Sequence, residues 1–178
     1  ADGFLRLALQ PTVHTVILDA DDPGTRALAA ALEGSGKQVV LVGEADDADV
    51  RIGQFGFAGG GAHALLQADG DLGPLELAVP GRHNLHNAAL AYAAGRALGV
   101  DGARLRAAAA AFNGTHRRFQ QVAEVGGVTI VDDYAHHPTE VVATLTAARV
   151  YAGERRLVAC FQPHLFTRTR DFAAELAQ

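Results

Sequence analysis

The feature that most constrains the fold is a strand–helix–strand pattern near the start of the 178-residue chain. The β-branched run Thr12–Leu18 is typical of a strand. Asp22 and Pro23 then provide an N-cap and a first-turn proline for a helix that continues to about Gly34. A second apolar run, Gln38–Val42, predicts another strand. Two strands joined through a helix by short links predict a parallel pair with a right-handed crossover, and therefore an α/β fold.

The next segments predict an antiparallel edge to this sheet, followed by two helices. Within Asp49–Val79, short runs broken by Gly and Asp predict hairpins, with the triple glycine Gly59–Gly61 at a hairpin tip. Apolar residues at helical spacing predict a helix over Leu85–Leu98, and Asp101 caps an alanine-rich helix that ends at Phe112.

Asn113-Gly114 breaks the second helix, so we expect a domain boundary there, with one incomplete α/β domain over residues 1–114 and another over 115–178. A polar stretch follows the boundary. The elements predicted beyond it are a strand at Val128–Val131, a helix at Thr139–Ala152, a strand at Leu157–Phe161 and a last helix from about Thr169.

Bulk composition excludes several classes of protein. Half of the chain is apolar (49%), so a packed core is expected rather than disorder. No apolar run approaches the roughly 20 residues that cross a bilayer, and the N-terminus does not resemble a signal peptide. The formal net charge of −5 argues against a general nucleic-acid binder. Cys160, the single cysteine, agrees with a reducing cytoplasm, where we expect the protein to work.

A glycine-rich turn, Gly34-Ser35-Gly36-Lys37, superficially suggests a phosphate-binding loop. A phosphate-binding loop needs G-x-x-x-x-G-K-[ST] between a strand and a helix, but Ala31 and Gln38 stand at two of the required positions. The order of elements is also reversed, so no helix N-terminus would face a phosphate. We interpret the segment as an ordinary helix-to-strand turn.

Two polar segments in the middle of the chain are candidate ligand-binding residues. Asn84 and Asn87 lie three residues apart at a helix start, and an amide can match the edge of an adenine ring. Simple helix capping by Asn84 is the alternative interpretation. Arg117 and Arg118 lie in the expected linker, where an arginine fork suits phosphate, although paired arginines there are often only solvated.

The most informative segment, VDDYAHHPTE at residues 131–140, follows a predicted strand and opens a predicted helix. Open α/β sheets bind ligands at such strand ends. The next predicted strand ends in FQPHLFTRTR, at residues 161–170, so both clusters should converge on one crevice, with Arg168 able to bind a carboxylate. A zinc site is disfavoured because His136 and His137 are adjacent and point apart.

In order, the segments PGRHNLHNAALA (80–91), FNGTHRRF (112–119), VDDYAHHPTE (131–140) and FQPHLFTRTRD (161–171) resemble the Mur ligase family over essentially the whole chain. Asp21-Asp22-Pro23 is similar to a further element of that family's central domain. The resemblance implies that residues 1–114 are the C-terminal part of a central ATP-binding domain, a parallel sheet with antiparallel edge hairpins. It implies that residues 115–178 open a Rossmann-like C-terminal domain that closes the site.

The resemblance also implies roles for individual residues. Asn87, with Asn84 beside it, would bind adenine, Asp133 the ribose and Arg118 the nucleotide phosphates. His136, His164 and Arg168 would lie near the incoming amino acid and the muramoyl carboxylate, with Arg118, His136 and Arg168 as the candidate catalytic residues.

The implied reaction joins L-alanine to the carboxylate of UDP-N-acetylmuramate through an acyl phosphate made from ATP. Mg²⁺ is expected as a cofactor, with ligands mainly outside this segment, and the remaining domains of the same enzyme are the expected partners. The family's phosphate-binding lysine and substrate-binding domain are not among these residues, so we expect the 178 residues alone to be inactive. Leu165 stands where many relatives have arginine.

Two alternatives stay open at this point. One is a recycling ligase of the same family that attaches a tripeptide to the same acceptor; Tyr134 and Gln162–Thr169 favour the alanine-adding enzyme instead. The other is a non-catalytic nucleotide-binding module, for which the residues on the amino-acid side would have no purpose.

Overall fold

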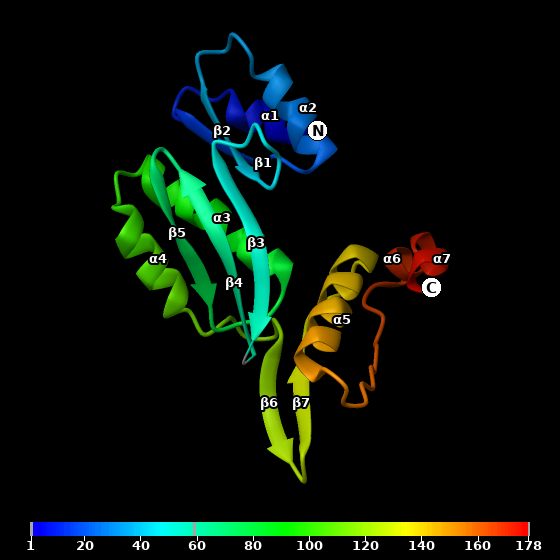
Figure 1. The fold of residues 1–178 in the computed structure, drawn as a ribbon. Helices are drawn as coiled ribbons and strands as arrows, with labels where there is room; N and C mark the ends of the chain where they lie inside the picture. Colours follow the sequence, from blue (N-terminus) through cyan, green and yellow to red (C-terminus); the bar gives the residue numbers. More distant parts are fainter. Residues whose placement is uncertain (1, 59, 178) are drawn as a thin grey trace.

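The computed structural model describes residues 2–58 and 60–177, and Figure 1 shows a five-stranded sheet with its helices followed by a separate two-stranded sheet. The larger sheet has the spatial order β1 (Thr15–Asp19), β2 (Gln38–Gly43), β3 (Val50–Ala58), β4 (Gly61–Ala68), β5 (Asp71–Leu77). The smaller sheet pairs β6 (Gln120–Val125) with β7 (Val128–Asp132). The helices are α1 (Asp2–Ala8), α2 (Pro23–Ala31), α3 (Arg82–Ala97), α4 (Gly102–Ala110), α5 (Pro138–Ala152), α6 (Phe166–Asp171) and α7 (Ala173–Leu176). Among the described residues, no helix is both long enough and apolar enough to cross a membrane.

The predicted strand–helix–strand unit is confirmed. β1 and β2 pair in parallel, with Thr15 opposite Gln38, and α2 connects them. The Asp22 side chain caps α2 by accepting a 2.8 Å hydrogen bond from the Thr25 N–H. β3 continues the sheet in parallel with β2, and β4 and β5 follow as antiparallel hairpins, which confirms the predicted edge. Gly60 and Gly61 lie at the first hairpin tip, whereas Gly59 is outside the described residues.

The turn at Gly34–Lys37 has a structural role, as predicted. It joins α2 to β2, and the Lys37 Nζ donates hydrogen bonds of 2.7 Å and 2.6 Å to the carbonyl oxygens of Gln10 and Val13. Since these bonds hold the ammonium against the chain, it does not face a phosphate site.

The core lies between the sheet and α3. Alternate residues of β4 and β5 point inward, as the strand period requires. Leu66, Leu75 and Leu85 are 0% exposed, and Ala89 and Ala93 let α3 approach the sheet closely. Burial of these side chains holds one face of α3 against the sheet. The opposite face of the helix carries Asn87, which is exposed.

The second unit, from β6 to α7, departs from the predicted strand–helix–strand arrangement. β7 pairs antiparallel with β6, which lies in the stretch expected to be only polar. Gly126 and Gly127 both have positive φ (58° and 78°) and form the two-residue loop that joins the strands. The predicted strand Leu157–Phe161 is wrong: the described residues provide it with no ladder partner, and Val158 is 73% exposed.

Several helix boundaries also differ from the prediction, and one helix was not predicted. α3 begins at Arg82 rather than Leu85, because the Gly81 carbonyl accepts hydrogen bonds from the N–H groups of Asn84 and Leu85. The last helical segment begins at Phe166 rather than Thr169 and is broken at Phe172. α1 was not predicted, since seven residues give too short an apolar pattern to recognise.

A polar contact ties both helices to the sheet edge. Asp71 on β5 accepts a 2.6 Å hydrogen bond from the Tyr92 hydroxyl of α3 and forms an ion pair with Arg106 of α4. The Tyr92 hydrogen bond and then Arg106 lower the pKa of Asp71, against the opposing effect of burial. The fold therefore favours the ionised form of the Asp71 carboxyl group.

This contact predicts a pH dependence of stability. Asp71 contributes stability above its unfolded-state pKa, which is near the ordinary value of 3.8, and the contribution disappears as the pH falls through the lower folded-state pKa. Asp71→Asn should therefore lower the free energy of unfolding at neutral pH, with a difference from the native chain that shrinks at acid pH. Urea unfolding at a series of pH values measures this. Asp69→Asn, an exposed neighbour, is the matched control; a pH-independent difference for Asp71→Asn would contradict the assignment.

Candidate functional site: a cleft between the two sheets

A cleft of about 750 Å³ lies between the helices of the first unit and the opening of the second. The first unit contributes Leu77, Val79, His83, Asn84, Asn87, Ala88, Ala91, Tyr92, Leu105, Ala108, Ala109 and Phe112. The linker between α4 and β6 (residues 111–119) and the second unit contribute Gly114, Thr115, Arg118, Asp133, Thr139, Glu140, Ala143 and Thr144. An apolar wall with a few convergent polar groups is typical of a small-molecule site.

On the α3 wall, the two predicted asparagines lie differently. The Asn84 Nδ2 donates a 2.7 Å hydrogen bond to the Pro80 carbonyl, so this side chain also stabilises the helix start, as the alternative interpretation required. Asn87 is exposed, and within the described residues its amide makes no side-chain hydrogen bond. Asn87 therefore keeps a donor and an acceptor for a ligand in the cleft.

Sequence reasoning missed His83, which lies on the same wall one residue before Asn84. Burial lowers the pKa of His83; Asp133 opposes this shift, and the positive charge of Arg118 adds to it. The imidazole is therefore neutral at physiological pH and can accept one hydrogen bond and donate another. The only sequence signal for a role of His83 was its position beside Asn84 in the segment at residues 81–84.

On the wall opposite α3, Asp133 connects the linker to the turn before α5. Its Oδ2 accepts a 2.7 Å hydrogen bond from the Phe119 N–H, and its Oδ1 accepts a 2.7 Å bond from the Ala135 N–H. The Tyr134 N–H donates to the Arg117 carbonyl at 2.8 Å, which doubles the attachment of the linker to the end of β7. Each carboxylate oxygen keeps a further lone pair for a ligand hydroxyl.

The histidine and glutamate that open α5 form a capping box. The His137 side chain accepts from the Thr139 N–H at 3.4 Å, and Glu140 Oε2 accepts from the N–H groups of His136 and His137 at 3.1 Å and 3.3 Å. Burial raises the pKa of Glu140, but these backbone hydrogen bonds and the nearby positive groups outweigh it, so the pKa lies below its ordinary value. Glu140 is thus a carboxylate at neutral pH, on the cleft wall.

The predicted residues of the amino-acid side form a separate group. The rings of His136 and His164 lie 6.0 Å apart, and Tyr134 packs against both. None of these three lines the cleft, although Glu140 connects His136 to it. Arg168 lies on α6 and, among the described residues, has no ion pair. The expected convergence of all these residues on one crevice is therefore only partial, because Leu157–Phe161 forms no strand that would bring Arg168 to the end of β7.

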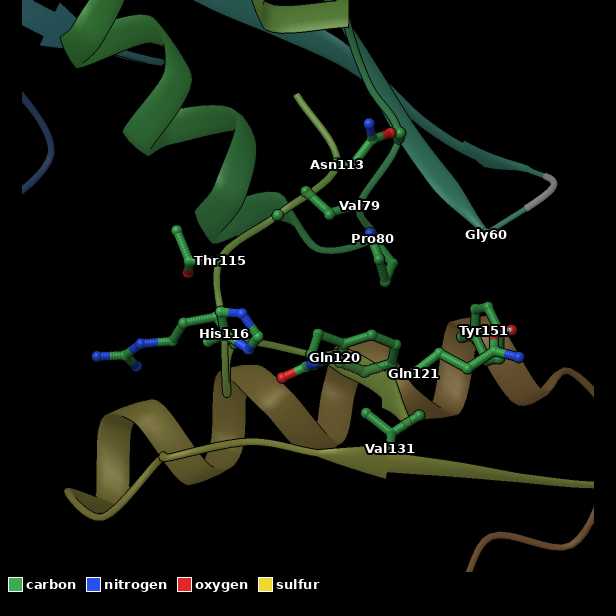
Figure 2. Close-up of a pocket in the computed structure, with 14 residues that line it drawn as sticks. Gly60, Val79, Pro80, Asn113, Thr115, His116, Gln120, Gln121, Val131 and Tyr151 are labelled. Atoms are coloured by element: carbon green, nitrogen blue, oxygen red, sulfur yellow. Dashed lines mark hydrogen bonds between the residues drawn. The ribbon is translucent and has the colours of Figure 1, made fainter. Parts of the chain in front are cut away.

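A smaller cavity of about 340 Å³ shares Val79, Gly114, Thr115 and Arg118 with the cleft. Figure 2 shows Gln120, Gln121, Val131 and Tyr151 of the second unit facing Val79 and Pro80 of the first. The linker thus forms a wall of both cavities, and a change in its conformation alters both.

One group of side chains has metal-ligand character. In the described part of the chain, donor atoms of Asp19, Asp21 and His86 all lie within 4.8 Å of one another. However, Asp21 accepts from the N–H groups of Glu44 and Ala45, and His86 Nε2 lies 3.0 Å from Glu44 Oε1. These contacts account for the group as an anchor of the loop after β2.

Two family models match the chain: the Mur ligase middle domain over residues 4–95, and the Mur ligase, glutamate ligase domain over residues 117–178. The chain belongs to the Mur ligase family. The resemblance carried by the four sequence segments is confirmed.

Relatives with assigned names agree. The chain is 52% identical over 98% of its length to the UDP-N-acetylmuramate–L-alanine ligase of Cutibacterium acnes, and covers 37% of that protein. It is 43% identical over 92% of its length to the enzyme of the same name from Streptomyces avermitilis, and covers 35% of it. The chain thus spans little more than a third of these relatives.

Solved structures give the same fold. The UDP-N-acetylmuramate–alanine ligase of Thermotoga maritima matches with a TM-score of 0.70 and 27% identity, over 89% of this chain and 35% of that one. The folylpolyglutamate synthetase of Lactobacillus casei matches over 86% of this chain and 41% of that one, with a TM-score of 0.67 and 18% identity, which shows a shared fold alone.

The linker geometry predicts a specific sensitivity at Gly114. This residue has φ of +94°, and a Cβ there would lie 3.0 Å from Val79 Cγ1. Gly114→Ala should destabilise the fold by about 1–3 kcal/mol through backbone strain and crowding. Gly99→Ala is the matched control, since Gly99 has φ of +80° but open space around its Cβ position. Urea unfolding should show the larger loss for Gly114→Ala; equal losses would mean that the Val79 contact is relaxed without cost.

Proposed function

We propose that the cleft binds ATP, with adenine against Asn84 and Asn87, the ribose hydroxyls on Asp133 and the phosphates on Arg118. The observation that supports this most directly is that these residues, from three separate segments, line one cavity of about 750 Å³. The chemistry also fits, since amides match the adenine edge, a carboxylate accepts from hydroxyls and guanidinium pairs with phosphate.

On this basis the protein is an ATP-dependent ligase that joins L-alanine to UDP-N-acetylmuramate, as the names of its relatives suggest. Residues 1–114 would be the later part of the central ATP-binding domain and residues 115–178 the start of the C-terminal domain. The carboxylate of the muramoyl substrate attacks the γ-phosphorus and ADP leaves. The amine of L-alanine then attacks the acyl carbon, phosphate departs and the amine loses a proton.

The residues of this chain would bind and orient the nucleotide during this reaction. Arg118 offsets phosphate charge, while closure of the two units around ATP excludes water from the acyl phosphate. Mg²⁺ would supply further charge neutralisation, and its ligands are expected mainly in other parts of the enzyme. His136, His164 and Arg168 are proposed for the amino-acid side, and the cytoplasm is the proposed compartment.

The adenine assignment can be tested by binding. Asn87→Ala should weaken ADP and ATP binding about tenfold or more, because loss of a paired amide costs roughly 1–3 kcal/mol. Isothermal titration with ADP measures this. Asn113→Ala is the matched control, since Asn113 lines only the smaller cavity. Equal losses in the two variants would contradict adenine binding at Asn87.

The reaction is tested in the full-length ligase that carries these residues. Phosphate release should require both UDP-N-acetylmuramate and L-alanine, and Arg118→Lys should lower kcat/KM for ATP about tenfold or more, because lysine cannot reproduce the guanidinium fork. The 178-residue chain by itself should release no phosphate. Turnover with a tripeptide but not with L-alanine would identify the recycling ligase instead.

A further inference from the structure

Glu140 lies where the two proposed halves of the site meet. Its Oε2 accepts from the backbone N–H groups of His136 and His137, at 3.1 Å and 3.3 Å. Its Oε1 lies 3.7 Å from the Nη1 of Arg118. The same side chain lines the cleft and is 35% exposed. Glu140 therefore contacts both the helix cap and the cation proposed to bind phosphate.

The cap alone does not explain a charged residue at this position. A capping box works with glutamine as well as glutamate, because the backbone N–H groups need only an oxygen acceptor. The negative charge strengthens these capping bonds, and it also has a second consequence, which falls on Arg118.

Arg118 is the only arginine or lysine on the cleft wall, and Glu140 is its only ion-pair partner among the described residues. The other acid on the wall, Asp133, already accepts backbone hydrogen bonds on both oxygens. At 3.7 Å, with the Arg118 side chain 50% exposed, the pair is weak enough for a phosphate to displace it.

We propose that Glu140 is a positioning residue that holds Arg118 in the empty cleft and yields it to the phosphates when nucleotide binds. This inference rests on the proposed ATP site and deepens it. Because the phosphates must compete with the carboxylate for the guanidinium, Glu140 weakens nucleotide binding and favours release of ADP. The charge acts on the phosphates only, so adenosine, which has none, should not sense it.

The test compares Glu140→Gln with the native sequence, both in the full-length ligase, in titrations with ADP and with adenosine. Glutamine keeps an oxygen acceptor for the cap and removes the charge, so ADP should bind roughly fivefold more tightly while the affinity for adenosine stays unchanged. The melting temperature should fall slightly, because the lowered pKa of Glu140 shows that the fold favours its charged form. At about 1 M salt, where the screening length is about 3 Å, most of the ADP gain should disappear. Glu154→Gln, an exposed site in the same unit, is the control for net charge.

A second comparison separates competition for Arg118 from simple repulsion of phosphate. In an Arg118→Gln background, Glu140→Gln should lose most of its effect on ADP, because the guanidinium that was contested is gone. An undiminished gain in that background, weaker ADP binding by Glu140→Gln, or no change would overturn the inference. If Asn87→Ala weakens ADP binding while Glu140→Gln has no effect, the nucleotide site stands and only this inference fails. Absence of nucleotide binding by the native full-length ligase would remove both.

Discussion

The carboxylate of Asp133 is the contact on which the cleft depends. Its two oxygens bind the N–H of Phe119 in the linker and the N–H of Ala135 in the turn before α5. These bonds fix the linker to the end of β7, and Arg118 and Glu140 then line the cleft opposite α3. The first of these bonds also holds Phe119 in the left-handed conformation, with φ of 46°, which non-glycine residues rarely adopt. Asp133, which we propose to bind the ribose, therefore also holds the linker and the turn before α5 in place.

The two units approach each other closely at Gly81. This glycine has φ of +107°, and a Cβ there would lie 2.7 Å from the His83 ring and 3.3 Å from the Ala147 methyl of α5. Ala147 is 4% exposed, although most of α5 is open to solvent. A side chain at position 81 would therefore clash with His83 and crowd Ala147, so glycine permits both the position of His83 and the contact with the second unit.

Much of the first unit follows from local signals in the sequence. Asp22-Pro23, the β-branched runs and the Gly- and Asp-rich turns specify β1 to β5, because hydrophobic period and turn chemistry agree there. The second unit was harder to predict. The pair Gly126-Gly127 is a hairpin signal that could have revealed β6, whereas Leu157–Phe161 has a strand-like composition but no neighbour to pair with. A strand depends on its ladder partners, which a local pattern does not report.

The sequence could indicate residues of the candidate site but not their geometry. The motifs identified Asn84, Asn87, Arg118 and Asp133, and all four line the cleft. They gave no indication that Asp133 is held by Phe119, that Glu140 faces Arg118, or that Arg168 lies apart on α6. Such contacts depend on how the linker turns, and that is decided by hydrogen bonds between residues far apart in the chain.

The Asp71 contacts attach one side of the cleft, but not the other, to the larger sheet. Tyr92 and Leu105 line the cleft on helices that the Asp71 contacts join to β5, so this side is tied to the larger sheet. The opposite side is joined to the first unit by a linker that contains Gly114. Displacement of the linker side would therefore widen or narrow the cleft without breaking the Asp71 contacts. If a nucleotide binds here as proposed, its base would keep the same surroundings, and the distance from the base to the guanidinium of Arg118 would report how far the linker side has moved.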